Sequence, residues 1–287
     1  MVLVGFLAIG PALGLGVASL FYEGNLMVEL LKYPPDPSIF FPLMIIQGIT
    51  SLMGLIIIPI LYLKFSEHKS IVPFFQRESD ITKIFTIIPL LGISFLIAIS
   101  PITEWNMSFQ FPDFLKEFGS WARAQEDKLT ELTKLLTNFN STPEFILGLI
   151  VIAVLPGIGE ELVFRGLIQN ELWRSSKNIH IAIWISAFLF SAIHVQFFGF
   201  APRLLLGALF GYLYYWSGNL LIPMVAHFFH NGFTLTMIHL YNQGAIDINI
   251  DSEESVPVYL VALCAGVTFV LIYYFRKHYT SSEQPLS

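Results

Sequence analysis

The chain has 287 residues, of which 55% are hydrophobic and 13% are charged, and its formal net charge is −6. Soluble domains carry about 25% charged residues, so this composition and a mean hydropathy of +0.67 exclude an ordinary soluble domain. The negative charge gives no support for nucleic-acid binding, and a single cysteine, Cys264, excludes an intramolecular disulfide framework.

Long apolar runs predict an all-α membrane protein, because a transmembrane helix needs about 20 mostly apolar residues. The candidate spans, about eight, are residues 2–21, 40–63, 82–102, 145–172, 179–197, 202–216, 219–240 and 257–275. The first lacks the basic segment of a secretory signal, so we expect a retained span. The predicted fold is a polytopic transmembrane helical bundle, with the whole chain, 1–287, as a single membrane domain.

Basic residues in the short loops predict the orientation of the chain. They follow the second, fourth and last spans: Lys64, Lys69, Arg77 and Lys83, then Arg174 and Lys177, then Arg276 and Lys277. The loop before the last span is acidic, with Asp247, Asp251, Glu253 and Glu254. With eight spans, both termini and all of these basic loops face the cytoplasm, and Arg203 is an exception. We expect an integral, multi-pass membrane protein, in the cell membrane if its source is bacterial.

Residues 103–142 form the one sizeable polar region of the sequence. Apolar side chains recur there at helical spacing: Phe114, Phe118, Trp121, Leu129, Leu132, Leu136 and Phe139. Charged residues fill the other face, which predicts an amphipathic helical insert outside the membrane, either a solvated hairpin or a functional lid. Asn106-Met-Ser and Asn140-Ser-Thr match the N-glycosylation pattern, which has meaning only in a secretory eukaryotic context.

Ionisable residues inside spans are costly, and each is therefore a candidate for function. The fourth span carries Glu160, Glu161 and Arg165. At ideal α-helical spacing, Glu161 and Arg165 are i,i+4 neighbours that can pair, whereas Glu160 points about 100° away. We expect different roles for the two carboxylates, with Glu160 suited to a general base. An ion pair such as Glu161–Arg165 is, taken alone, more often structural than catalytic.

Histidines and an asparagine lie in two later spans. His194 ends the run Phe190-Ser-Ala-Ile-His194, and His227 and Asn231 are i,i+4 neighbours that project from one helix face. We interpret His230, which is rotated off that face, as structural, because a single intramembrane histidine is often only an interhelical hydrogen-bonding residue. The convergence of a carboxylate, two histidines and an asparagine from three spans indicates a common cavity.

The order of these motifs resembles a known family. Glu-Glu-x-x-x-Arg, Phe-x-x-x-His and His-x-x-x-Asn on successive helices resemble the CPBP family of CAAX proteases and bacteriocin-processing enzymes, which includes the type II CAAX prenyl endopeptidases. The resemblance covers residues 143–233, with the stretch from Gly211 to Pro223 included, and marks them as a catalytic core. It implies an intramembrane endopeptidase that hydrolyses a peptide bond of a membrane-associated substrate.

The resemblance also implies a role for each motif residue. Glu160 and His194 would activate a water molecule, and His227 and Asn231 would stabilise the oxyanion of the tetrahedral intermediate. Supporting roles would fall to the two remaining charged residues, Glu161 and Arg165. These roles agree with the chemistry of amide hydrolysis, which needs a base for water and donors aimed at the developing oxyanion.

Three other interpretations stay open from the sequence. Glu160, His194 and His227 could bind zinc as a His₂Glu site with an open water position, but no His-Glu-x-x-His signature is present, so we favour a mechanism without a cofactor. A non-catalytic membrane scaffold on the same fold is a second alternative. A transporter is the third, and it predicts repeated halves that the sequence lacks. The expected partners are membrane lipid and a peptide or lipidated-protein substrate, with no nucleic acid; the natural substrate and the oligomeric state stay open.

Overall fold

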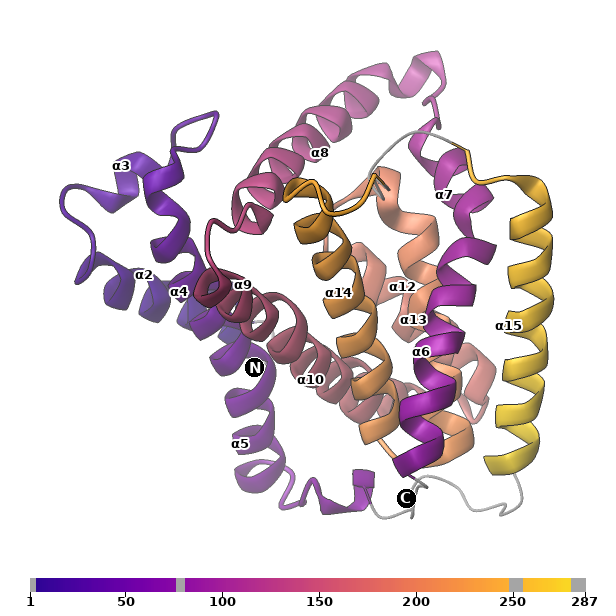
Figure 1. Ribbon diagram of the computed structural model, residues 1–287. Coiled ribbons are helices and arrows are strands. Elements are labelled where there is room, and N and C mark those ends of the chain that lie inside the picture. The colour runs from indigo at the N-terminus through magenta and orange to yellow at the C-terminus, as the bar shows by residue number, and fades with distance from the viewer. Residues whose placement is uncertain (1–3, 76–80, 248–254, 280–287) are drawn as a thin grey trace. The chain divides into compact units, whose positions relative to one another are not determined.

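The computed structural model describes residues 4–75, 81–247 and 255–279, and most of them are helical (Figure 1). No strand occurs within these ranges, so the predicted all-α fold is confirmed. Several features named above lie outside the described residues: the beginning of the first span, Arg77, and the acidic residues Asp251, Glu253 and Glu254.

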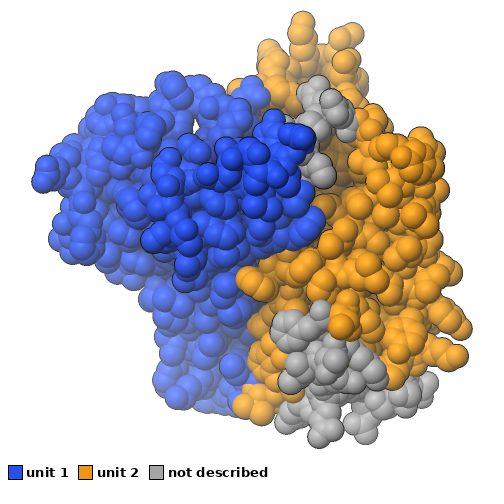
Figure 2. Space-filling view, in the orientation of Figure 1, with its two compact units in different colours: residues 1–71, 127–163, 231–251 blue, residues 72–126, 164–230, 252–287 orange. Residues whose placement is uncertain are grey.

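The chain separates into two compact units (Figure 2). Unit 1 comprises Met1–Ile71, Asp127–Val163 and Asn231–Asp251, and unit 2 comprises Val72–Glu126, Phe164–His230 and Ser252–Ser287. Three helices contain a boundary between the units along the chain: α8 (Lys116–Thr137), η7 (Leu162–Gln169) and α14 (Leu221–Asn242). The single membrane domain expected from the sequence stays a prediction.

The helices of unit 1 follow the first, second and fourth predicted spans. They are η1 (Gly5–Ile9), α2 (Gly10–Ser19), α3 (Leu26–Leu30), η2 (Pro37–Ile39), α4 (Phe40–Ser51), η3 (Leu52–Ile57), α5 (Ile58–Phe65), α9 (Thr142–Gly148), η6 (Leu149–Val154) and α10 (Leu155–Glu161). The segments η1, η3, η6 and η7 are π-helical. Such segments are rare and are frequent at functional sites.

Glycines allow two helices of unit 1 to pack with their backbones close together. A β-carbon on Gly10 would lie 2.8 Å from the Cα atom of Thr50, and one on Gly14 would lie 2.8 Å from the Cα atom of Ile46. Any larger residue would push α2 away from α4.

The core of unit 1 fixes the helical run that leads to Glu160. Its buried side chains come from α4, α8, η6, α14 and the segment before α9: Phe40, Met44, Leu136, Phe139, Val151 and Leu235. The Oγ atom of Ser141 accepts a hydrogen bond from the N–H group of Glu144 at the start of α9. This is the side-chain cap that serine provides at a helix N-terminus.

The helices of unit 2 follow the remaining predicted spans. They are η4 (Val72–Phe75), α6 (Ile81–Ala98), α7 (Ser100–Met107), η5 (Asp113–Leu115), α11 (Asn170–Ser176), α12 (Ile179–Ala192), η8 (Phe197–Gly199), α13 (Phe200–Ser217) and α15 (Val258–Tyr279). Helices α6 and α7 are bent by 45° relative to each other. Pro101 explains the break, because it has no N–H group for the carbonyl of Ile97, and the Ser100 hydroxyl donates to that carbonyl instead at 2.9 Å.

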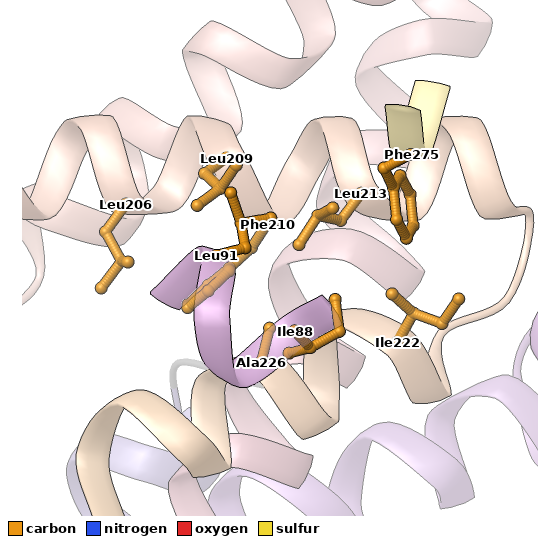
Figure 3. Close-up of a cluster of buried hydrophobic side chains, with 9 residues drawn as sticks. All are labelled: Ile88, Leu91, Leu206, Leu209, Phe210, Leu213, Ile222, Ala226 and Phe275. Atoms are coloured by element: carbon orange, nitrogen blue, oxygen red, sulfur yellow. The ribbon is translucent and has the colours of Figure 1, made fainter. Parts of the chain in front are cut away.

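A cluster of buried apolar side chains joins α6, α13, α14 and α15 (Figure 3). Its members are Ile88, Leu91, Leu206, Leu209, Phe210, Leu213, Ile222, Ala226 and Phe275. A buried hydrogen bond from the Thr268 hydroxyl to Ser94 Oγ, at 3.0 Å, also joins α15 to α6. This core holds α13 and α14, the helices on either side of the turn that precedes His227.

Gly207 and Gly211 serve helix packing. A β-carbon on Gly207 would lie 3.1 Å from Cδ1 of Phe190, and one on Gly211 would lie 2.9 Å from Cγ2 of Ile183, so both glycines allow α13 to approach α12. A tight turn joins α13 to α14. Gly218 ends α13 with a φ of 61°, and Asn219 Oδ1 accepts a hydrogen bond from the N–H group of Leu221 at 2.9 Å.

Helices suited to cross a membrane are present, so the chain is an integral membrane protein. Four helices within the described ranges are long and apolar enough: Pro37–Phe65, Thr142–Ser176, Phe197–Ser217 and Val258–Tyr279. The bent pair Thr86–Ala98 and Ser100–Met107 gives a fifth if it is one span. Gly5–Ser19 and Ile179–Ala192 are apolar but shorter. Each of the eight predicted spans corresponds to a helix, but the number of spans and the orientation of the termini stay predictions.

The polar insert is helical, as its amphipathic pattern predicts. The main element of the insert is α8. The apolar side chains of the insert are divided between buried and exposed positions: Ala122 and Leu136 are buried, whereas Phe114 and Trp121 are exposed. The insert also contains η5 and the end of α7.

Candidate active site

The two adjacent carboxylates lie at the end of α10 and differ in exposure. Glu161 is completely buried, at 0% exposure, whereas Glu160 is partly exposed. A β-carbon on Gly159 would lie 2.6 Å from Cβ of Leu55, so η3 packs directly against the turn that carries these residues. The contrast in exposure agrees with the expectation that the carboxylates have different roles, because only Glu160 has surface for a water molecule or a substrate to contact.

The helix that follows these carboxylates does not have ideal α-helical geometry. Residues Leu162–Gln169 form the π-helix η7, in which hydrogen bonds join residues five apart and each turn holds more residues. The direction of Arg165 relative to Glu161 that we took from 3.6 residues per turn is therefore wrong, whereas Glu160 and Glu161 both lie in the α-helix α10, where the expected offset of about 100° holds. Periodicity could not reveal this, because the apolar pattern of a single π turn resembles that of an α-helix.

Asn231 contacts the same helical run from within unit 1. Its Nδ2 atom donates a hydrogen bond to the carbonyl oxygen of Ile152, at 3.2 Å. Ile152 lies four residues before Pro156, whose ring nitrogen has no hydrogen to donate at α-helical spacing. The Asn231 amide thus satisfies a backbone acceptor in the helix that leads to Glu160.

His194 lies in the turn after α12, and its ring orientation is fixed by the backbone. The Nδ1 atom lies 2.8 Å from the carbonyl oxygen of Phe190. A carbonyl oxygen can only accept, so Nδ1 carries a proton in this contact, and the neutral ring has its lone pair on Nε2. His194 is therefore oriented with Nε2 as the nitrogen that can accept a proton from water or bind a metal ion.

His227 is buried in α14, at 3% exposure, between two aromatic rings. Its imidazole stacks on the ring of Phe210, with centroids 5.1 Å apart, and contacts the edge of the Phe190 ring at 5.8 Å. The ring of His194 also contacts Phe190, with centroids 5.3 Å apart. Unit 2 thus brings two of the four expected catalytic residues against one phenylalanine.

Arg165 packs on the same two rings. It is 1% exposed, and its guanidinium carbon lies 4.7 Å from the centre of Phe190 and 5.4 Å from the centre of Phe210. Its Nη2 atom donates a hydrogen bond to the carbonyl oxygen of Gly207 at 2.8 Å. These contacts are those of a residue that holds the aromatic rings in place, in agreement with a supporting role.

The six expected site residues are divided between the units. Unit 1 contains Glu160, Glu161 and Asn231, and unit 2 contains Arg165, His194 and His227. Sequence reasoning missed the contribution of Phe190 and Phe210 to the unit 2 cluster. Phe190 is visible in the sequence as the first residue of the Phe-x-x-x-His motif. Its spacing from His194 does not reveal that it also contacts His227.

The described residues contain no group of three or more His, Cys, Asp and Glu side chains that could hold a metal ion. The zinc site of Glu160, His194 and His227 remains an alternative for experiment.

Comparisons with known proteins point to one family. Residues 142–233 match the family described as "Type II CAAX prenyl endopeptidase Rce1-like", a segment that contains all six expected site residues. No solved structure matches the chain.

Three relatives come from bacteria. "Uncharacterized protein YpbD" from Bacillus subtilis is 26% identical over 162 residues, which are 54% of this chain and 73% of that protein. "Membrane-embedded CAAX protease MroQ" from Staphylococcus aureus is 30% identical over 118 residues, which are 39% of this chain and 46% of that protein. "Sporulation-killing factor biosynthesis protein SkfC" from Bacillus subtilis is 37% identical over 81 residues, which are 26% of this chain and 16% of that protein. The chain thus spans less than half of the length of two of these relatives.

Proposed function

We propose that the chain is an intramembrane endopeptidase of the CAAX protease type, which hydrolyses a peptide bond of a membrane-associated substrate with water activated by Glu160 and His194. The observation that carries this assignment is the hydrogen bond between His194 Nδ1 and the Phe190 carbonyl oxygen. It orients Nε2 as the acceptor of the ring, which is what a base for water requires.

The proposed reaction has two steps. Glu160, together with His194, takes a proton from the water molecule, and the hydroxide oxygen forms a bond to the scissile carbonyl carbon. The negative charge moves to the carbonyl oxygen, where N–H groups of His227 and Asn231 donate hydrogen bonds. The tetrahedral intermediate then collapses, the C–N bond breaks, and the proton held by the enzyme passes to the leaving amine.

Glu160 is favoured over Glu161 as the base because of its exposure. A base must lie within hydrogen-bond reach of the water whose proton it removes. Glu161, at 0% exposure, has no surface for that contact, whereas Glu160 is partly exposed and can make it.

The setting of His227 suits an electrostatic role. Its ring lies between Phe210 and Phe190, where few water molecules can compete with the substrate. A hydrogen bond to a developing oxyanion is stronger in such a low-dielectric environment than in water.

The proposed substrates are peptides or lipidated proteins held in the membrane. The Staphylococcus relative is named as a membrane-embedded CAAX protease, and one Bacillus relative is named for the biosynthesis of a sporulation-killing factor. Both are compatible with cleavage of a membrane-bound precursor. The second candidate is a zinc-dependent protease with Glu160, His194 and His227 as ligands, because the Nε2 lone pair of His194 would equally serve a metal ion.

The first experiment measures cleavage and metal content together. The detergent-solubilised, purified protein is assayed on a quenched peptide library, with and without chelator, beside His194→Ala. His180→Ala is the matched control, since His180 lies near the start of α12, the helix that precedes His194, and bonds Tyr212 instead. Cleavage by metal-free protein that His194→Ala abolishes supports the proposal. One zinc per chain with activity lost on chelation supports the metal mechanism, and cleavage of no peptide supports a scaffold.

A further inference from the structure

The polar insert has no part in the reaction proposed above, yet it contacts the loop that carries His194. Asn106, at the end of α7, is 8% exposed and uses both ends of its side-chain amide. Nδ2 donates to the carbonyl oxygen of Phe197 at 2.9 Å, and Oδ1 accepts from the N–H group of Ala201 at 2.7 Å. Because the amide is engaged and buried, the glycosylation pattern at Asn106 does not present an available acceptor.

The bond to Ala201 is an N-cap supplied from a distant segment. The first N–H groups of a helix have no partner within the helix, and a side chain at the N-cap position usually satisfies one of them. The N-cap residue of α13 is Gly199, which has no side chain and makes no such bond. Asn106 provides it from 95 residues earlier in the chain.

The loop between α12 and α13 needs support from outside because its backbone is strained. Val195, directly after His194, has a φ of 54°, in the left-handed region that β-branched residues rarely adopt. Such a conformation persists only where surrounding contacts impose it.

Other contacts of the insert act on the same loop. The guanidinium of Arg123, in α8, lies 3.3 Å from the ring centre of Phe198. The rings of Phe118 and Trp121 pack against Phe197, with centroids 5.0 and 5.9 Å away. The aromatic contacts are non-directional, whereas the two hydrogen bonds of Asn106 fix the first residue of η8 and the first turn of α13.

We propose that Asn106 is a positioning residue for His194, which acts by holding η8 and the start of α13 so that the loop keeps His194 in its orientation. The inference rests on the proposed function of His194. It assigns the insert a purpose in catalysis without placing any of its residues at the reacting atoms.

Loss of the two Asn106 hydrogen bonds is expected to change turnover more than substrate binding. In Asn106→Ala, kcat falls roughly 10- to 100-fold, as expected for a small misplacement of a catalytic group, while KM stays close to its wild-type value. Asn106→Asp keeps the acceptor for the Ala201 N–H group but cannot donate to Phe197, so its kcat is intermediate. Asn140→Ala is the matched control, because Asn140 lies in the same insert and is exposed; it leaves kcat unchanged.

A spectroscopic measurement tests the same idea without using activity. In protein labelled with ¹⁵N-histidine, the ring signals of His194 are assigned by their absence in His194→Ala. Wild type is expected to show the tautomer with a proton on Nδ1, and Asn106→Ala a mixture of both tautomers. If Asn106→Ala does not fold, as judged by thermal unfolding, Asn106→Asp supplies both readouts.

The outcomes separate this inference from the proposed function. Wild-type kcat and an unchanged tautomer in a folded Asn106 variant overturn the positioning role, even if His194→Ala is inactive. Full activity in His194→Ala refutes the catalytic role of His194, whatever the tautomer measurement gives for Asn106.

Discussion

The side-chain amide of Asn231 donates a hydrogen bond to the carbonyl oxygen of Ile152, four residues before Pro156. The bond ties α14 to the helical run that leads to Glu160, so Asn231 has a structural partner as well as a proposed catalytic one. An asparagine amide has two N–H groups, and one of them can serve the helix while the other serves the substrate oxyanion.

Replacing Asn231 should therefore affect both rate and stability. Asn231→Ala is expected to lower kcat roughly 10²–10³-fold, as for loss of an oxyanion donor. It should also destabilise the fold by about 1–3 kcal/mol, because the Ile152 carbonyl loses its partner. Steady-state kinetics and thermal unfolding measure the two effects. Asn242→Ala, at the exposed end of the same helix, is the control, and a wild-type rate in Asn231→Ala would exclude the oxyanion role.

Glu160→Gln should abolish base catalysis while it keeps the shape of the side chain. The expected loss of kcat is roughly 10²–10⁴-fold, the usual contribution of a general base, with normal expression and unfolding temperature. Glu171→Gln is the matched control, since Glu171 lies on the same helical run with a side chain that is 70% exposed. Full activity in Glu160→Gln would refute the proposed mechanism.

His227→Phe separates packing from hydrogen bonding at the buried histidine. Phenylalanine can keep the ring contacts with Phe210 and Phe190 but has no N–H group. We expect a thermal unfolding midpoint near that of wild type, with kcat reduced about 10²-fold or more. His230→Phe, on the same helix, tests the interpretation of His230 as structural and should keep most of the activity. Equal losses in the two variants would contradict these assignments.

Gly207→Ala should disturb the cluster around Phe190. The added β-carbon would lie 3.1 Å from Phe190 Cδ1 and 3.2 Å from the Cα atom of Ala187, so the ring or the helix has to move. Such overpacking costs typically about 1–3 kcal/mol, and activity should fall because both histidines contact that ring. Gly266→Ala, on α15, is the control, since its β-carbon would meet no atom within 4 Å. Unfolding and cleavage assays compare the two variants, and identical behaviour would argue against a rigid Phe190 cluster.

The helical fold could be predicted from the sequence because apolar runs of sufficient length specify their own secondary structure. The turn before α14 has a local cause too, since Gly218 adopts the left-handed conformation and the side chain of Asn219 accepts a hydrogen bond from the N–H group of Leu221. The motif order predicted a resemblance to the CAAX proteases, and residues 142–233 match the model of a family of that kind.

Other features depend on contacts between distant segments and have no local pattern. The shared contact of His194 and His227 with Phe190 joins three positions through packing, which residue spacing does not encode. Asn106 was visible only as part of a glycosylation pattern, because a cap supplied from 95 residues away leaves no trace near the helix it serves.

The π-helix η7 makes the site depend on local helix geometry. A π segment is equivalent to one inserted residue within an α-helix, and Leu162–Gln169 follows directly after the carboxylates. If the same residues adopted α-helical spacing, the side chains after the segment would turn by about 100° relative to those before it. Arg165, inside the segment, would then change its direction relative to the rings of Phe190 and Phe210, although no motif residue had been changed. The hydrogen-bond spacing after Glu161 is thus as much a determinant of the site as the identity of its side chains.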